Sequence, residues 1–193
     1  LTCNSNESPM QSKSHRAPKA LLFIMRSDIV KLANCEVIGV ELGVAQGVFS
    51  AQALQYQPIK HWYAIDMWAG DRGHDHRQYA HATNALAPYA DRVTIMRSRF
   101  EDVVHQFVDS YFDFIYIDGY AHTGQEGGKT LSDWWPKLKT GGVFAGDDYH
   151  ADWPLTVSSV DTFCESQNTK LNIHHFDEQN HWSRYPSWYT RKE

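Results

Sequence analysis

Short apolar segments alternate with amphipathic segments along most of the chain. Five apolar, β-branched segments have strand length, and each is followed by a segment with apolar residues at helical spacing. This alternation predicts parallel β–α–β units with right-handed crossovers and helices on both faces of one sheet. Strands buried on both faces should read as continuous apolar runs, as these do. The predicted strands are 36–42, 61–68, 92–97, 112–119 and 141–149, and the predicted helices are 48–57, 76–89, 100–108, 129–139 and 156–166.

The two ends of the chain depart from this alternation. Residues 1–18 are rich in Ser, Asn, Pro and Lys, which predicts a flexible tail. Residues 19–35 place apolar side chains at helical spacing and predict a leading helix. Residues 171–192 hold two strand-like segments around "DEQN" with no helix between them, so the last strand is predicted to be antiparallel to its neighbour. We expect one doubly wound, mostly parallel sheet in a single domain over residues 19–193.

Composition and charge narrow the function classes. The 193 residues include 42% hydrophobic residues, enough for a core, and the net charge of -5 argues against a nucleic acid bound through a basic surface. No apolar run approaches the roughly 18 residues that span a bilayer, and the first segment lacks the apolar centre of a signal peptide. Three widely spaced cysteines favour a reducing compartment over a disulfide framework. We therefore expect a cytoplasmic protein with no membrane partner.

Acidic residues end four of the five predicted parallel strands. Ligands of an open parallel sheet bind outside the carboxyl ends of its strands. A single acid there is commonly a helix cap or a turn residue, but a row of acids on one edge repels itself unless a cation or a polyhydroxyl ligand compensates. The acids are Glu41, Asp66, Asp118 and the pair Asp147 and Asp148, while the third strand runs into Ser98 and Phe100.

The turn after the first strand, "ELGVAQG", has the composition of a ligand-binding loop. Gly43 and Gly47 permit positive φ and allow a ligand to approach the backbone. The N–H groups of the next helix favour negative charge, but Glu41 beside them favours a ligand with a cationic part. Asp66 follows about twenty residues later, where an acid accepts the two ribose hydroxyls of a nucleoside. The Gly-x-Gly-x-x-Gly spacing of dinucleotide sites is absent.

Together these motifs resemble the class I S-adenosylmethionine-dependent methyltransferases. "VELGVAQG" is similar to their glycine-rich first motif, "YAIDMW" to their ribose-binding second strand, and "SWYTRK" to their reversed seventh strand. "FDFIYIDG" and "GGVFAGDDY" resemble the small bacterial O-methyltransferase branch that carries IDG-x-H and GDDY motifs. The resemblance covers roughly residues 36–192 and implies a Rossmann-like sheet of about seven strands with a C-terminal antiparallel hairpin.

The resemblance implies a role for each matching residue. The turn after the first strand would wrap the methionine part of the cofactor, Asp66 would accept the ribose hydroxyls, and Met67 would pack on the adenine. Phe100 would contact the adenine or, alternatively, belong to the core under the next helix. The implied cofactor-binding residues are Glu41, Gly43, Ala45, Gln46, Gly47, Asp66, Met67, Ser98, Phe100 and Asp118.

The resemblance also implies catalytic and metal-binding residues. In the metal-dependent branches, acids after strands four and five hold a divalent cation, which here would be Mg²⁺ on Asp118, Asp147 and Asp148. The alternative is that Asp118 contacts the cofactor's amino group and one of the paired acids caps a turn. The predicted catalytic residues are Asp118 and His122. His122 is the candidate general base, or else an ordinary loop histidine. Weaker candidates near the expected mouth are His74, His76 and His150.

The predicted function is methyl transfer from S-adenosylmethionine to an oxygen of a small hydroxylated acceptor, with metal assistance as an option. Two rivals stay open: an NAD-type oxidoreductase, which the missing glycine spacing and the terminal hairpin count against, and a non-catalytic nucleoside-binding module. The expected partner is the small-molecule acceptor, and a homodimer through the leading helix or the hairpin edge is left open. Aromatic residues that would stack on the acceptor, or pack around the rim, are Trp68, Tyr120, Tyr149 and Trp153.

Overall fold

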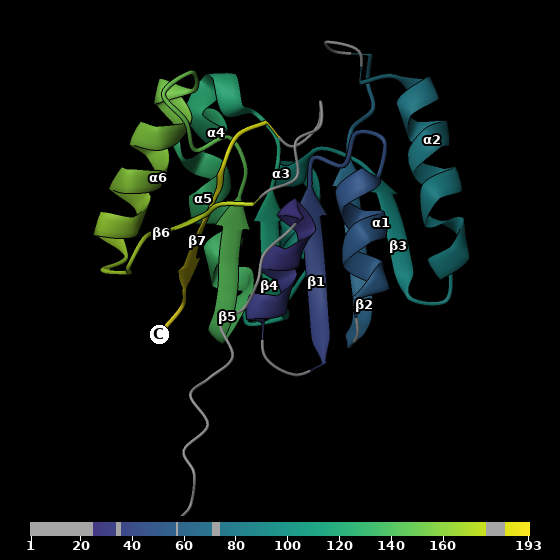
Figure 1. The fold of residues 1–193 in the computed structure, drawn as a ribbon, viewed down its shortest axis with the longest axis horizontal. Coiled ribbons are helices and arrows are strands. Elements are labelled where there is room, and N and C mark those ends of the chain that lie inside the picture. The colour runs from purple at the N-terminus through teal and green to yellow at the C-terminus, as the bar shows by residue number, and fades with distance from the viewer. Residues whose placement is uncertain (1–24, 34–35, 57, 71–73, 177–183) are drawn as a thin grey trace, which may run out of the picture.

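Within the described residues, seven strands form one sheet, and helices cover both of its faces (Figure 1). The structure is a computed structural model that describes residues 25–33, 36–56, 58–70, 74–176 and 184–193. The strands are β1 (Val37–Leu42), β2 (Ile59–Asp66), β3 (Val93–Arg97), β4 (Phe112–Ile117), β5 (Leu138–Gly146), β6 (Asn172–His174) and β7 (Ser187–Arg191).

The order of the strands confirms the doubly wound sheet. It is β3-β2-β1-β4-β5-β7-β6, with β1 to β5 parallel and β7 antiparallel to both β5 and β6. The predicted reversal of the last strand is therefore confirmed as well. Successive strands are added on one side of β1, as β2 and β3, and then on its other side, as β4 and β5. The order of the strands therefore reverses between β1 and β4. In sheets of this kind a ligand crevice opens at that switch point.

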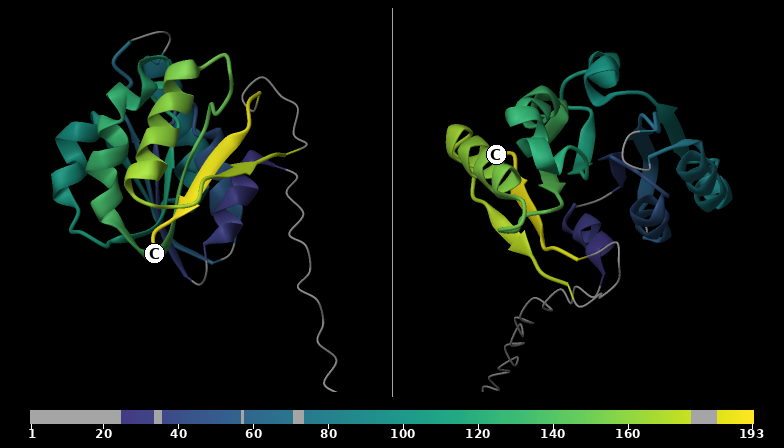
Figure 2. Two further views of the ribbon diagram at one scale, coloured as in Figure 1. Left: turned by 90° about the vertical axis from the view of Figure 1, so that its left-hand side faces the viewer. Right: turned by 90° about the horizontal axis from the view of Figure 1, so that it is seen from above.

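Helices lie on both sides of the sheet, as the view from above in Figure 2 shows. One side carries the 3₁₀ helix η1 (Arg26–Leu32), α1 (Val48–Gln55) and α2 (His76–Leu86), and the other carries α3 (Phe100–Val103), α5 (Lys129–Trp134) and α6 (Pro154–Ser166). The remaining helical elements have only three or four residues each. They are η2 (Ala87–Tyr89), η3 (Val104–Gln106), η4 (Ala121–Thr123), α4 (Gly124–Gly127) and η5 (Trp135–Lys137). No helix among the described residues is long and apolar enough to cross a membrane.

Each face of the sheet buries its own apolar core. Alternate residues of a strand point to opposite faces, so the unbroken apolar run of β4 supplies both cores. Phe114 and Tyr116 join the core beneath α1 and η1, whereas Ile115 and Ile117 join the core beneath α3, α5 and α6. The ring of Phe49 from α1 stacks on Tyr116 with centroids 4.0 Å apart. This stack forms an aromatic floor under the carboxyl edge of the sheet.

The leading helix differs from its prediction. The sequence predicts a helix over 19–35, but within the described residues only Arg26–Leu32 is helical, and it has 3₁₀ geometry. Three residues per turn place side chains three apart on the same side, so Arg26 faces inward with Ile29. The predicted tail, 1–18, lies outside the described residues.

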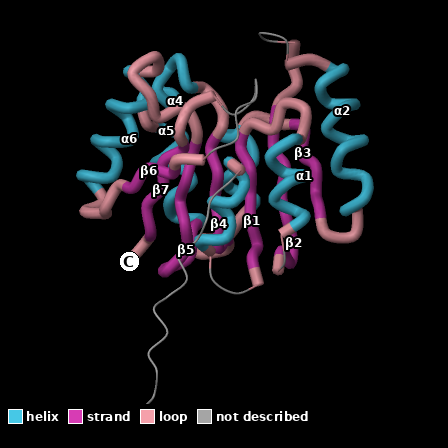
Figure 3. Tube along the Cα trace, in the orientation of Figure 1, coloured by secondary structure: helices cyan, strands magenta, loops and turns pink. Residues whose placement is uncertain are grey.

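The carboxyl ends of the parallel strands lie along one edge of the sheet (Figure 3). Backbone hydrogen bonds just beyond β4 and β5 bring two of the predicted acids to this edge. The Asp118 N–H donates to the Leu42 carbonyl at 2.7 Å, and the Asp147 N–H donates to the Ile117 carbonyl at 3.0 Å. The ladder therefore continues one residue past each strand and places Asp118 next to both Gly43 and Asp147.

Gly43 is expected to be a residue that the fold cannot replace. Its φ is +95°, and a Cβ built there would lie 2.1 Å from the Asp118 carbonyl oxygen. Gly70 is a matched control, because its φ is +86° and nothing lies within 4 Å of its added Cβ. Gly70→Ala should lower the free energy of unfolding by about 1 kcal/mol, the cost of the left-handed backbone. Gly43→Ala should cost more than about 3 kcal/mol, because the backbones must also separate. Equal losses in urea unfolding would contradict this account.

Candidate functional site

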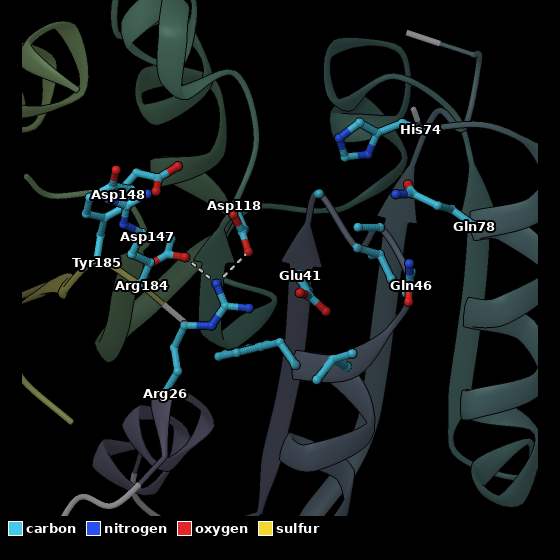
Figure 4. A pocket seen from close by; sticks show the side chains of 15 residues that line it. Arg26, Glu41, Gln46, His74, Gln78, Asp118, Asp147, Asp148, Arg184 and Tyr185 are labelled. Carbon is cyan, nitrogen blue, oxygen red and sulfur yellow. Dashed lines mark hydrogen bonds and ion pairs between the residues drawn. The ribbon is translucent and has the colours of Figure 1, made fainter. Parts of the chain in front are cut away.

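Two adjoining cavities open at the carboxyl edge of the sheet. Their volumes are about 410 and 230 Å³. They share Gly43, His74, Asp118 and Asp148 as lining residues, so we treat them as one trough with a larger and a smaller cavity. The volumes suit a small molecule, since such sites typically occupy roughly 300–1,000 Å³. Figure 4 shows the side chains that line the larger cavity.

A buried arginine stands in the larger cavity, between the carboxylates of β4 and β5 (Figure 4). Nη1 of Arg26 donates to Asp118 Oδ2 at 2.8 Å and forms an ion pair with Asp147 Oδ2. Its guanidinium lies 5.4 Å from the ring centroid of Phe49 and 5.9 Å from that of Tyr116. Although burial disfavours its charge, Asp147 and Asp118 keep the pKa of Arg26 well above its ordinary value. Arg26 is therefore a permanent cation held in one place.

Glu41 is a further acid that lines the larger cavity. Its side chain is almost completely buried, and this burial raises the pKa of Glu41 well above its ordinary value. Trp62 Nε1 donates to the Ser50 hydroxyl oxygen at 2.7 Å. The hydroxyl proton of Ser50 is therefore free to be donated to Glu41. Four acids, Glu41, Asp118, Asp147 and Asp148, line this cavity together with two arginines, Arg26 and Arg184. Because acidic groups outnumber the arginines, the cavity suits a ligand that carries positive charge.

Asp66 lies beside the smaller cavity and holds the loop after β1. Its Oδ2 accepts the N–H groups of Val44 and Ala45, both at 2.9 Å, and its Oδ1 accepts the N–H of Trp68 at 3.0 Å. A carboxylate oxygen has two acceptor sites, so Oδ1 retains one for a ligand hydroxyl. Asp66 can therefore shape the loop and bind a ligand at the same time.

The trough brings together most of the predicted cofactor residues. Eight of them line it, and Asp118 and Gly43 lie where the two cavities meet. The larger cavity is lined by Glu41, Gly43, Ala45, Gln46 and Asp118, and the smaller by Gly43, Asp66, Met67, Phe100 and Asp118.

Two predicted cofactor residues do not line either cavity. Gly47 is the N-cap of α1 with φ +82°, and a Cβ there would lie 3.1 Å from the Ala82 Cα, so this glycine permits α1 to pack closely on α2. Ser98 donates its N–H to the Asp66 carbonyl at 2.9 Å, which extends the pairing of β2 and β3.

Two histidines line the trough. His122, the predicted base, lies on η4 and lines the smaller cavity, where Thr156 Oγ1 anchors the turn by donating to the Ala121 carbonyl at 2.9 Å. His74 lines both cavities, and its Nδ1 lies 4.0 Å from Asp66 Oδ2. The two other histidines considered from the sequence, His76 and His150, line neither cavity.

The predicted aromatic contacts to an acceptor divide into two groups. Tyr120 and Trp153 line the smaller cavity and can meet a ligand. Trp68 is fully buried, and its Nε1 donates to the Ala45 carbonyl at 2.8 Å, so of the two alternatives predicted for it, packing and not contact with an acceptor is the one observed. The Tyr149 hydroxyl donates into α6, and Tyr149 lines neither cavity.

The predicted Mg²⁺ ligands do not fit a metal ion in this arrangement. Over the described part of the chain, no three His, Cys, Asp or Glu side chains form a group that could hold a metal. Asp118 and Asp147 both contact Arg26 instead. The second oxygen of Asp147, Oδ1, accepts from Ser187 Oγ at 3.4 Å, so both of its oxygens are engaged by the protein. The guanidinium occupies the place expected for the divalent cation.

Some lining residues were missed from the sequence. The sequence held an indication for Arg26, because an arginine inside the apolar segment "LLFIMRSDIV" needs a charged partner if that segment is buried. Arg184 and Tyr185, which also line the larger cavity, carried none. Tyr185 stacks on His150 with centroids 4.8 Å apart, and its hydroxyl donates to Asp152 at 2.7 Å. These contacts join the segment before β7 to the segment after β5.

The strand order, with β7 reversed and the glycine loop after β1, defines a Rossmann-like fold whose cavities open at the carboxyl edge of the sheet. A family model described as "Methyltransferase domain" matches residues 40–149, which is more than half of the chain. The chain belongs to this methyltransferase family, and it has the Rossmann-like fold of class I methyltransferases.

Solved structures show the same fold at low sequence identity. A precorrin-6y C5,15-methyltransferase from Geobacter metallireducens is 14% identical with a TM-score of 0.65, covering 87% of each chain. An S-adenosylmethionine-dependent O-methyltransferase from Thermotoga maritima is 15% identical with a TM-score of 0.63, covering 86% of this chain and 64% of that chain. A spermidine synthase from Thermotoga maritima, also 15% identical with a TM-score of 0.63, matches 85% of this chain, which spans only 56% of the synthase. No curated protein sequence matches the chain.

We expect Asp148 to make stability depend on pH. Burial, with the charges of Asp147 and Asp118, raises the pKa of Asp148 to about 8, whereas an unfolded aspartate titrates near ~3.9. Between these values the native state holds a proton that the unfolded chain has lost, so the free energy of unfolding falls as pH rises from about 4 to about 8. Asp148→Asn should flatten this decline in urea unfolding. Some slope should remain, because burial also raises the pKa of Asp147 to about 6.

The exposed Asp91 provides the control for this measurement. Asp91→Asn should keep the slope of the unmodified protein, since its carboxyl lies outside the trough. Identical slopes in both variants would show that Asp148 is not the group responsible.

Proposed function

We propose that the protein transfers the methyl group of S-adenosylmethionine to a hydroxyl oxygen of a small acceptor. The observation that carries this proposal is the trough itself, with Asp66 in the smaller cavity, Glu41 in the larger cavity and Asp118 where the two meet. A ligand with a ribose at one end and positive charge at the other matches both ends. Membership of the methyltransferase family supports the same ligand.

The lining residues suggest how the cofactor lies. Met67 and Phe100 give the smaller cavity an apolar wall for the adenine, and Asp66 Oδ1 accepts a ribose hydroxyl. Glu41, Gly43 and Asp118 of the larger cavity would hold the amino-acid tail, with the two carboxyl groups toward its ammonium. The cationic groups of the ligand thereby offset the surplus of acid.

Oxygen is the proposed nucleophile because a hydroxyl must give up a proton, and histidines line the trough. When bound, S-adenosylmethionine supplies a methyl carbon whose bond to sulfur breaks, with the electron pair going to sulfur, as the bond to oxygen forms. His122 takes the hydroxyl proton on an imidazole nitrogen, since an imidazole can hold a proton near neutral pH. Tyr120 and Trp153 flank the acceptor and keep water away. The similar fold of an O-methyltransferase agrees with this choice.

Calorimetry tests the cofactor part of the proposal. S-adenosylhomocysteine should bind with measurable heat and NAD should not, because only the former has a tail that suits the acidic cavity. Asp66→Ala should weaken S-adenosylhomocysteine binding at least about tenfold through the lost ribose contact and the loosened loop. Asp91→Ala, at an exposed site outside the trough, should bind as the unmodified protein does. No heat with S-adenosylhomocysteine, on protein shown to be folded, would contradict the proposal.

Kinetics test the acceptor part. With a panel of small hydroxylated acceptors, His122→Gln should lower kcat by about 10²–10⁴ while the affinity for S-adenosylhomocysteine stays unchanged, because only the proton acceptor is lost. His76→Gln is the matched control and should leave kcat unchanged, since His76 lines neither cavity. An unchanged kcat in His122→Gln, with a loss in His74→Gln, would assign the base to His74 instead. Turnover with amines alone would contradict transfer to oxygen.

A further inference from the structure

The ends of β4 and β5 hold two carboxylates that share one cation. Asp118 Oδ2 and Asp147 Oδ2 both contact the same nitrogen, Nη1 of Arg26. A small metal ion held by both oxygens, at about 2.1 Å for Mg²⁺, would have to lie between them, where Nη1 lies. The guanidinium and a bridging metal would therefore compete for the same place.

Arg26 cannot leave that place easily. Its side chain is only 7% exposed, and its guanidinium lies over the rings of Phe49 and Tyr116. The helix that carries it is held to β7, because Arg191 Nη2 donates to the Leu32 carbonyl at 2.6 Å. Swinging the guanidinium out would break two ion pairs and leave Asp118 and Asp147 facing each other. A buried ion pair that loses one partner leaves an uncompensated buried charge, which is strongly unfavourable.

The surroundings of Asp147 also favour the arginine. Its Oδ1 accepts from Ser187 Oγ, which in turn lies 2.8 Å from the Tyr116 hydroxyl. Asp147 is thus oriented by groups inside the fold, and its exposed fraction is 6%. Asp118 is different, since its side chain is 26% exposed and lines both cavities. Arg26 therefore anchors Asp118 from behind while Asp118 faces the trough.

We infer that Arg26 is the resident cation of the trough, taking the place of a divalent metal between the carboxylates of β4 and β5. Arg26 acts as a positioning residue: it neutralises Asp147 and fixes the orientation of Asp118 toward the ligand. Methyl transfer then needs no divalent cation, and this part of the inference rests on the proposed function. The cation-binding part does not, because it concerns the folded protein without any ligand.

Manganese binding to the protein without ligand tests this inference, with Mn²⁺ followed by electron paramagnetic resonance. The unmodified protein should take up no stoichiometric Mn²⁺. Arg26→Ala removes the guanidinium and should bind one equivalent of Mn²⁺ at least about tenfold more tightly than the unmodified protein. Arg26→Lys keeps a cation and should behave as the unmodified protein. Arg77→Ala, which removes an exposed arginine from α2, should also show no gain.

A second readout separates positioning from general stability. Arg26→Ala should bind S-adenosylhomocysteine more weakly, and added Mn²⁺ should recover part of the affinity by restoring a cation between Asp118 and Asp147. A residue needed only for folding would show no such recovery. Arg26→Gln, which keeps the side-chain length without the charge, replaces Arg26→Ala if circular dichroism shows the alanine variant to be unfolded.

Two results would overturn the inference. One is stoichiometric Mn²⁺ binding by the unmodified protein that Asp118→Asn abolishes. The other is a folded Arg26→Ala or Arg26→Gln variant with no more Mn²⁺ binding than the unmodified protein. Failure of the proposed function can be told apart from failure of this inference. If methyl transfer is absent but Mn²⁺ binding follows the expected pattern, Arg26 is still the resident cation and only its role in the reaction is removed.

Discussion

The ion pairs of Arg26 with Asp118 and Asp147 are the constraint on which the site depends. Parallel strands lie about 4.8 Å apart, so acids that end adjacent strands are forced together. Buried like charges are unfavourable without a compensating cation. Here the chain supplies that cation from η1, and the aromatic floor of Phe49 and Tyr116 supports it. The leading segment, though short, is therefore part of the site and does more than cover the sheet.

The same groups that shape the trough also face its ligand. Asp66 accepts three backbone N–H groups from the loop and the strand end, and it also lines the smaller cavity. Gly43 lets the loop pass against the Asp118 carbonyl, and both residues line the trough. Loop geometry and ligand binding are thus coupled, because a change in either residue alters the backbone that the ligand contacts. This coupling explains how a short loop can hold a defined shape without a ligand.

The family match covers most of the trough but not all of it. The family match, 40–149, spans β1 to β5 and most of the smaller cavity. Arg26, Trp153 and Tyr185 line the trough from outside that range. A spermidine synthase shares the fold, so the sheet alone does not define what the cofactor reacts with. Segments outside the matched region therefore build part of the trough.

The order of strands and helices, the reversed last strand and the row of acids at the carboxyl edge were all determined by the sequence alone. These features are local, since apolar periodicity defines each element and parallel pairing aligns the strand ends. The role of Arg26 was decided only by the tertiary structure, because Arg26 lies 92 residues from Asp118 and 121 from Asp147 along the chain. Likewise, the place of Trp68 just after a strand predicts a residue at the rim of the site. Only the packing of Trp68 against the loop after β1 shows that it is buried. Contacts between distant segments leave no periodic signal, so the partner of a buried charge is known only once the chain has folded.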